Sequence, residues 1–85
     1  MNFSDALQAA KEGKWIARAG WSGKGMHVYA EDSHRVKVRA GVFEGSFREY
    51  AAYLVLYNTE GKHQPGWLPS QADLFTDDWR IIEPS

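Results

Sequence analysis

The sequence contains no cysteine, no long apolar run and no excess of basic charge, and each absence excludes a class of protein. Without cysteine the chain forms no disulfide and offers no thiolate to a metal, so nothing favours an oxidising compartment. No apolar run approaches the roughly 18 residues of a membrane span, and residues 1–10 lack the pattern of a signal peptide. A formal net charge of −1 argues against duplex nucleic acid as a partner. The expected location is cytoplasmic.

Motifs for catalysis are missing as well. None of the histidines has a second ligand at zinc spacing, and no serine lies in a Gly-x-Ser-x-Gly elbow. Asp77 and Asp78 are adjacent, so their side chains are expected to point apart in a solvated turn, which does not suit an acid/base pair. We therefore expect a protein that is not an enzyme and that carries no metal or cofactor.

Aromatic residues are abundant, with four tryptophans among 85 residues. Trp15 and Trp79 lie in alternating, strand-like segments and are expected in the core. Trp21 and Trp67 lie beside glycines, where a large amphipathic ring suits a stacking site. The sequence therefore predicts a binding module with an aromatic site.

Hydrophobic periodicity predicts an α+β fold, with a small antiparallel sheet, an N-terminal helix and a second short helix, in a single ligand-binding domain over residues 1–85. The first helix is expected over residues 4–12 with Ser4 as its N-cap, and Leu74 of the second helix is expected in the core. Residues 40–52 have no clear period and stay open. The expected strands cover residues 14–18, 26–31, 35–39, 53–57 and 79–82.

A glycine-rich segment, Trp21-Ser-Gly-Lys-Gly-Met26, is a candidate phosphate site. Glycines at 20, 23 and 25 let backbone amides approach a ligand and form an anion-binding concavity. Lys24 adds a cation and Trp21 a stacking face. The spacing is not that of a P-loop. A tight turn between two strands accounts for the glycines equally well, and this alternative stays open.

The segment Gly66-Trp-Leu-Pro-Ser-Gln-Ala-Asp-Leu74 is a second candidate. Pro69 fixes the backbone just before Ser70, and free amides at a helix N-terminus attract anions. Trp67 lies just upstream, where its ring suits stacking on a base. The alternative is that Ser70 and Asp73 form a capping box and only satisfy each other's backbone amides.

These segments, together with Phe-Ser-x-Ala-Leu in the first helix, Gly13-Lys14, Arg18 and Asp78-Trp79, resemble a family of short phage and prophage proteins. That family includes the second type of Thoeris anti-defence sponge. The matching elements are Gly20-Trp-x-Gly-Lys-Gly-Met26 and Trp67-x-Pro-Ser-Gln-Ala-Asp-Leu74, and only residues 31–52 carry no match. Asn is common in the family where this chain has Ser22.

The resemblance implies a homotetramer that binds a glycosidic cyclic ADP-ribose signal of bacterial immunity, in the cytoplasm of the infected host, and sequesters it without cleavage. Some relatives also bind cyclic oligonucleotides. The ligand-binding residues implied by motif position are Arg18, Trp21, Lys24, Met26, Trp67, Ser70, Gln71 and Asp73. Stacking is expected from Trp21 or Trp67, phosphate binding from Lys24 and Arg18, and ribose contacts from Gln71 or Asp73. The alternatives are a phage structural or interaction module and a hydrolase of the signal.

Overall fold

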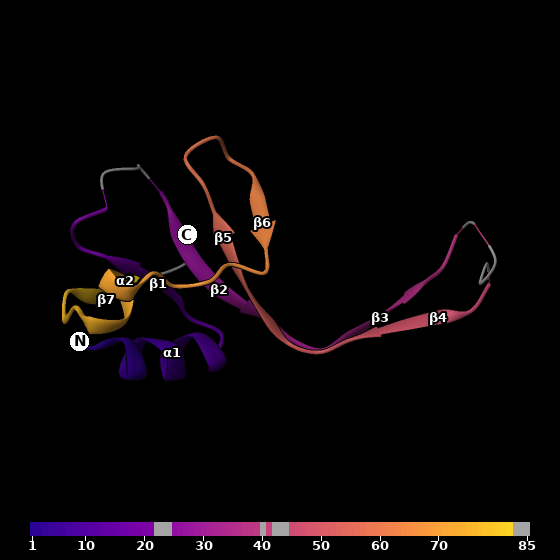
Figure 1. Cartoon of the computed structure of the whole chain (residues 1–85), viewed down its shortest axis with the longest axis horizontal. Coiled ribbons are helices and arrows are strands. Elements are labelled where there is room, and N and C mark those ends of the chain that lie inside the picture. Colours follow the sequence, from indigo (N-terminus) through magenta and orange to yellow (C-terminus); the bar gives the residue numbers. More distant parts are fainter. Residues whose placement is uncertain (22–24, 40, 42–44, 83–85) are drawn as a thin grey trace.

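The computed structural model describes residues 1–21, 25–39, 41 and 45–82. Within them it has two helices and seven strands, which confirms the predicted α+β class (Figure 1). In chain order the elements are α1 (Phe3–Lys11), β1 (Trp15–Arg18), β2 (His27–Glu31), β3 (His34–Lys37), β4 (Phe47–Tyr50), β5 (Tyr53–Tyr57), β6 (His63–Pro65), α2 (Gln71–Phe75) and β7 (Trp79–Ile82).

Five strands form one antiparallel sheet in the order β6-β5-β2-β1-β7. The strand predicted over residues 53–57 is an interior strand between β6 and β2. The short hairpin that joins β5 to β6 is closed by Asn58, whose side chain accepts hydrogen bonds from the backbone N–H groups of Glu60 and Lys62. The sheet, α1 and α2 are called the body below.

Helix α1 covers one face of the sheet with small side chains. Ala6, Ala9 and Ala10 are buried against Ile16 and Val28 in the core, and alanine lets a helix approach a sheet closely because it has no side chain beyond Cβ. The predicted N-cap, Ser4, is wrong. The Asn2 side chain instead accepts from the Asp5 N–H at 2.8 Å, since a cap must precede the helix that begins at Phe3.

The two faces of the sheet differ in chemistry. Ile16 lies opposite Val28 and Ile81, and Val28 lies opposite Leu56, so these apolar side chains share the face beneath α1. Successive side chains of a strand point to opposite faces. The face away from α1 therefore carries the aromatic side chains Trp15, His27, Tyr29 and Tyr57.

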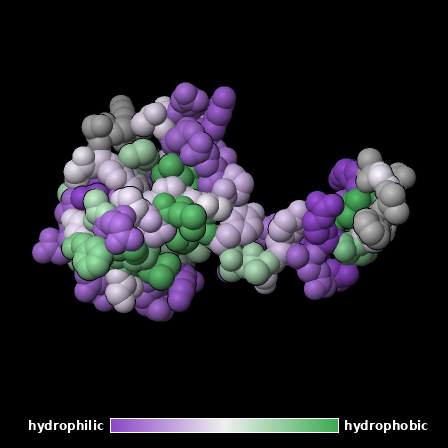
Figure 2. All heavy atoms as spheres, viewed as in Figure 1, coloured by the Kyte–Doolittle hydropathy of each residue, from purple (hydrophilic) through white to green (hydrophobic). Residues whose placement is uncertain are grey.

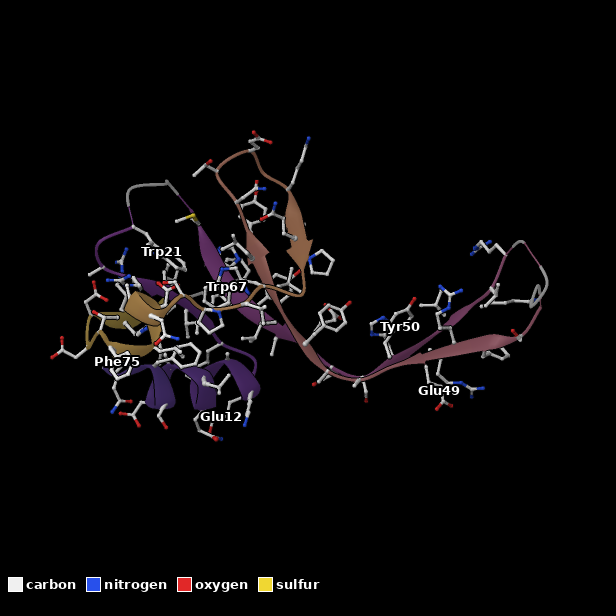
Figure 3. The ribbon with its side chains drawn as sticks, in the orientation of Figure 1. Glu12, Trp21, Glu49, Tyr50, Trp67 and Phe75 are labelled. Carbon is white, nitrogen blue, oxygen red and sulfur yellow. The ribbon has the colours of Figure 1, made fainter. Side chains whose placement is uncertain are left out.

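Helix α2 is the short capped helix that the sequence predicts, but Leu74 is not in the core. Leu74 is 40% exposed and Phe75 is 85% exposed, and Figure 3 shows Phe75 at the margin of the body. The position that faces inward is Asp73, whose backbone carbonyl accepts the buried indole N–H of Trp79 at 2.8 Å. Asp73 faces inward because its carboxylate bonds to Arg18 and to the Ser70 N–H, and Leu74, about 100° further round the helix, is left more exposed.

Strands β3 and β4 form a separate two-stranded ribbon, called the arm below, that projects from the body (Figure 1). This resolves part of the stretch left open by the sequence, because residues 47–50 are a strand. The projection makes the radius of gyration 15.1 Å, against about 12 Å for a compact chain of this length. Figure 2 shows hydrophilic and hydrophobic residues side by side on the arm.

None of the helices in the described ranges is long and apolar enough to cross a membrane.

Candidate functional site

Arg18, which the sequence predicts to meet phosphate, binds two carboxylates. Its Nη1 lies 3.0 Å from Oδ1 of Asp73, and its Nε lies 3.0 Å from Oδ1 of Asp78. One guanidinium thereby ties the end of β1 to α2 and to the turn before β7. Asp78 is half-buried, so the expectation of a solvated turn is wrong for this residue. Two neighbouring carboxylates weaken the attraction of Arg18 for an anion, and its contact with ligand stays a prediction.

These contacts shift the pKa of all three groups. Hydrogen bonds to Asp78 and then to Asp73 raise the pKa of Arg18. The Arg18 guanidinium lowers the pKa of Asp78. Partial burial pushes the pKa of Asp73 upward, but the Ser70 N–H and Arg18 together hold that pKa below its ordinary value. Both carboxylates are therefore ionised at neutral pH, and the cluster stabilises this end of the body.

Ser70 and Asp73 form the predicted capping box. The Ser70 N–H donates to Asp73 Oδ2 at 2.8 Å, and the Asp73 N–H donates to Ser70 Oγ at 3.1 Å. The Asp73 carboxylate thus occupies the position where an anion was expected, at the start of a five-residue helix. Gln71 is exposed beside it. The structure gives Ser70 and Asp73 a local stabilising role, and the ligand contacts of Ser70, Gln71 and Asp73 stay predictions.

Trp21, Trp67 and Trp79 form a cluster of edge-on rings, called the tryptophan cluster below. The ring centroids are 5.4 Å apart for Trp21 and Trp79, 6.2 Å for Trp21 and Trp67, and 6.3 Å for Trp67 and Trp79, with interplanar angles of 75–80°. Trp79 is buried, while Trp21 and Trp67 are half-buried and pack on the core. Figure 3 shows the last two inside the body, near α2. Trp21 lies outside the helices and strands, as expected, but its ring also packs on the core. The stacking of Trp21 or Trp67 on a ligand stays a prediction.

Met26 and Lys24 are the other predicted ligand-binding residues of the glycine-rich segment. Met26 is half-buried directly before β2, and its contact with ligand stays a prediction. Lys24 lies outside the described residues.

Gly25 has a φ of +78°, a left-handed conformation that residues other than glycine rarely adopt. The backbone carbonyl of Gly25 accepts the Nδ1–H of His27 at 2.7 Å, so this glycine fixes the orientation of an aromatic ring.

A second group of aromatic rings lines a cavity of about 520 Å³ on the sheet face away from α1. It is called the aromatic pocket below. Its lining comes from β1, β2, β5 and β6 and from the end of the glycine-rich segment. The lining residues are Trp15, Gly25, His27, Tyr29, Tyr57 and His63.

The rings at the base of the aromatic pocket are stacked face to face. The centroids of Trp15 and His27 are 3.9 Å apart with an interplanar angle of 9°, and those of His27 and Tyr57 are 5.0 Å apart at 22°. Tyr57 lies directly opposite His27 in the sheet register. Trp15 is half-buried rather than enclosed in the core, so its expected core position is only partly met.

A polar pair lies at the rim of the aromatic pocket. The Tyr29 hydroxyl and His63 Nδ1 are joined by a hydrogen bond of 2.8 Å. Partial burial, followed by the nearby charge of Glu31, raises the pKa of Tyr29. The phenol therefore stays protonated at neutral pH, and it acts in hydrogen bonding rather than as a charge.

Sequence reasoning missed most of this pocket. The sequence feature that could have indicated the pocket is the alternation of His27 and Tyr29 with Val28 and Ala30. Val28 and Ala30 face α1, so His27 and Tyr29 share the opposite face of β2. A histidine and a tyrosine on the face opposite the core residues indicate an aromatic surface. Only pairing with β5 brings Tyr57 against them, and that pairing is not visible in the local pattern.

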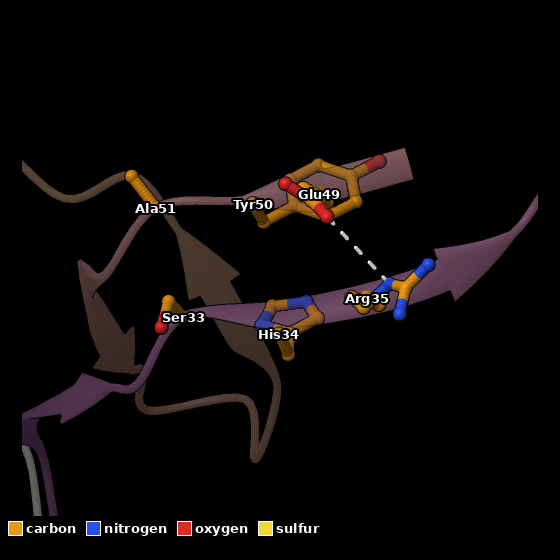
Figure 4. Close-up of a pocket in the computed structure, with 6 residues that line it drawn as sticks. All are labelled: Ser33, His34, Arg35, Glu49, Tyr50 and Ala51. Carbon is orange, nitrogen blue, oxygen red and sulfur yellow. Dashed lines mark ion pairs between the residues drawn. The ribbon is translucent and has the colours of Figure 1, made fainter. Parts of the chain in front are cut away.

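A shallower cavity of about 470 Å³ lies where the arm leaves the body (Figure 4). His34 stacks on Tyr50 with centroids 5.1 Å apart, and Arg35 Nε lies 3.7 Å from Glu49 Oε1 in an exposed ion pair. Exposed pairs of this kind contribute little to stability. This cavity repeats the histidine–tyrosine stacking of the aromatic pocket, but none of its lining residues is a tryptophan.

Within the described part of the chain, no three acidic or histidine side chains lie close enough together to hold a metal ion.

Comparison with known proteins agrees with the resemblance seen in the sequence. The profile of the Thoeris anti-defense 2-like domain family matches residues 1–82. The chain is similar to Thoeris anti-defense 2 of Bacillus phage SP01, with 29% identity over 84 residues that cover 96% of this chain and 94% of the relative. The match spans every helix and strand described above, including the arm.

Proposed function

The chain belongs to the Thoeris anti-defense 2-like domain family, and on that premise we propose that it binds a cyclic ADP-ribose-type immune signal and holds it without cleaving it. A protein of this kind suppresses anti-phage defence by lowering the free concentration of the signal in the infected cell, and we place it in the host cytoplasm. Family membership, which supports a phage anti-defence role, is the observation that carries the proposal. Residues 1–85 would act as one ligand-binding domain.

The chemistry of the body fits a nucleotide-like ligand. A cyclic ADP-ribose molecule presents a base, two riboses and a pyrophosphate, and its site needs an aromatic face and a few polar groups. The aromatic pocket holds about 520 Å³, within the range of about 300–1,000 Å³ typical of small-molecule sites. The eight motif residues remain proposed contacts, with Arg18 and Asp73 acting mainly by ordering the segment that carries Trp67.

Retention without cleavage is supported by the protonation of the Tyr29 phenol, which lies beside His63 in the body. Hydrolysis of a glycosidic or pyrophosphate bond needs an activated nucleophile or a placed acid/base pair. Tyr29 lies beside His63, but its raised pKa keeps the phenol protonated and makes it a poor nucleophile. A hydrolase is therefore the weaker alternative.

We also propose that the protein is a homo-oligomer, with the tetramer of the resembling proteins as the expected state. Large apolar side chains are exposed at both ends of α2, with Leu68 84% exposed before it and Phe75 85% exposed at its last residue. Exposed apolar clusters of this kind mark interfaces.

The arm supports the same proposal. A lone two-stranded ribbon is marginally stable in water, and Phe47 on the arm is 58% exposed. The two strands of the arm carry three basic residues and one acidic residue, which gives the arm a positive charge. The chain has ten basic and eleven acidic residues, so seven basic and ten acidic residues lie elsewhere. The opposite charges favour docking of one copy's arm on another copy's body.

The test is a retention experiment. The protein is mixed with glycosidic cyclic ADP-ribose, separated from free ligand, heat-denatured, and the supernatant is analysed by mass spectrometry. Recovery of intact ligand is the expected result. Recovery of a cleavage product would establish a hydrolase. If the protein retains neither glycosidic cyclic ADP-ribose nor, in a second experiment, a cyclic oligonucleotide, a structural module is favoured.

A further inference from the structure

The aromatic pocket is built on the sheet face that neither α1 nor the tryptophan cluster covers. Two of its rings, Trp15 and Tyr57, sandwich a third, His27, and the Gly25 carbonyl locks the orientation of that third ring. A stack of this kind is rigid before any ligand arrives, so little rotamer entropy is lost on binding. These rings line a cavity of about 520 Å³, which is large enough for a bicyclic ring system.

The pocket's polar rim completes the chemistry. The hydrogen bond between Tyr29 and His63 leaves one donor and one acceptor free in either histidine tautomer. If the phenol donates, His63 Nε2–H is a free donor and the phenol oxygen still accepts. If His63 Nδ1–H donates, the phenol O–H is a free donor and Nε2 accepts. A donor beside an acceptor is the pattern that the edges of nucleobases present.

His27 adds a further polar atom at the base of the pocket. Its Nδ1–H is committed to Gly25 at 2.7 Å, which fixes the tautomer so that Nε2 is an acceptor whenever the ring is neutral. No buried side-chain nitrogen or oxygen among the described residues lacks a hydrogen-bond partner. No hydrogen bond to Nε2 is seen among the described residues, and His27 lines the pocket. The ring that forms the middle of the stack therefore also offers a hydrogen bond.

We propose that the aromatic pocket is a nucleobase site, in which the base of a nucleotide signal lies on the ring stack and its edge bonds to the Tyr29–His63 pair. This inference rests on the proposed function, since it assigns the base of the signal to a place in the fold. It differs from the assignment implied by the motif, which gives base stacking to Trp21 or Trp67. Those rings are edge-on to one another and packed on the core.

The first test measures the affinity of three variants for glycosidic cyclic ADP-ribose by calorimetry. Trp15→Leu removes a stacking face and is expected to weaken binding roughly 5- to 150-fold. Tyr29→Phe and His63→Ala each remove one hydrogen bond and are expected to weaken binding about 2- to 12-fold. Because the two residues act as a pair, the double variant is expected to lose little more than either single variant.

The arm supplies matched controls. Tyr50 and His34 form a similar tyrosine–histidine stack outside the aromatic pocket, so Tyr50→Phe and His34→Ala are expected to leave the affinity within about twofold of the wild type. Thermal melts check folding, and Tyr29→Phe keeps the ring, so the test does not depend on the larger Trp15 change.

The outcomes separate the two proposals. If the wild type retains the probe and the pocket variants bind it as well as the controls do, the nucleobase site is wrong while the proposed function stands. If the wild type retains neither glycosidic cyclic ADP-ribose nor a cyclic oligonucleotide, the proposed function itself fails. Selective loss of affinity in the pocket variants supports both.

Discussion

The tryptophan cluster and the aromatic pocket are built from the same kinds of side chain, but their packing differs. In the tryptophan cluster the rings meet edge to face around Trp79, which is buried, and its N–H is used by the Asp73 carbonyl. In the aromatic pocket Trp15, His27 and Tyr57 stack face to face. His63 is edge-on to Tyr29 and Tyr57, and the Tyr29–His63 pair at the rim keeps hydrogen-bonding capacity beyond its own bond. Aromatic abundance alone therefore does not locate a binding site. The orientation of the rings and the fate of their polar atoms do.

Trp79→Ala is expected to have the largest effect on this comparison. Removing a buried indole and its hydrogen bond to Asp73 should destabilise the fold by about 3–5 kcal/mol. A small domain has only about 5–15 kcal/mol in total, so the variant should be largely unfolded or strongly weakened. Urea denaturation followed by circular dichroism measures this. A midpoint like that of the wild type would mean that the tryptophan cluster is not part of the core.

A pair of matched substitutions sharpens the contrast. Trp21→Leu is expected to lower the free energy of unfolding by about 1–3 kcal/mol, because a half-buried ring packed on the core is lost. Its effect on ligand affinity is expected to be smaller than that of Trp15→Leu. Trp15→Leu is expected to weaken ligand binding more than Trp21→Leu does and to lower the free energy of unfolding less. Thermal melts and calorimetry on both variants give the four numbers needed. A Trp21→Leu protein that is as stable as the wild type and fails to bind ligand would show that Trp21, rather than the aromatic pocket, stacks on the base.

The carboxylates around Arg18 predict a dependence on acid. Asp73 and Asp78 have lowered pKa values in the fold, so their contribution to stability is complete above the unfolded pKa of about 4. It is lost as the pH falls below that value and through the lowered pKa of each group. Thermal melts between pH 7 and pH 2 should show this loss. Arg18→Gln should flatten the acid limb, and an unchanged limb in that variant would show that other groups cause it.

Ser70→Ala is expected to have a smaller effect. Loss of the N-cap oxygen of α2 should cost about 0.5–2 kcal/mol, and each kcal/mol lowers the melting temperature of a domain of this size by roughly 4–8 °C. Ser4→Ala is the control, because Ser4 is exposed and is not the cap of α1. Equal melting temperatures for the two variants would contradict the structural role given to the capping box.

Phe47→Ser is expected to have the smallest effect on the stability of the body, within about 0.5 kcal/mol, because the side chain is exposed on the arm. Its effect should appear in assembly instead. Light scattering is expected to show an oligomer for the wild type and a shift toward smaller species for the variant. A monomeric wild type at micromolar concentration would contradict the proposed docking of the arm.

Much of the fold follows from local sequence, and the reasons are physical. Alternation and caps identify the helices and most strands, because these signals act within a few residues. Capping at Ser70 is an example. The errors arise where the local pattern does not decide. Asn2 rather than Ser4 caps α1, and Asp73 rather than Leu74 faces inward because its carboxylate bonds to Arg18, which is distant in the chain.

The candidate site was harder to predict for the same reason. Motif matching selected Arg18 and Trp21, whose partners lie about 46 to 60 residues away in the chain. The aromatic pocket depends on strand pairing that brings Tyr57 against His27 and His63 beside Tyr29. Neither pairing has a signature in a short sequence window, so only the assembled sheet reveals it.

The most direct test of this account is an intermolecular NOE measurement on the protein bound to glycosidic cyclic ADP-ribose. The protons of the base are expected to show contacts with the rings of Trp15 and Tyr57. The indoles of Trp21 and Trp67 should show none to the base. Contacts from the base to Trp21 or Trp67 alone would place the base at the tryptophan cluster and contradict the assignment of the aromatic pocket.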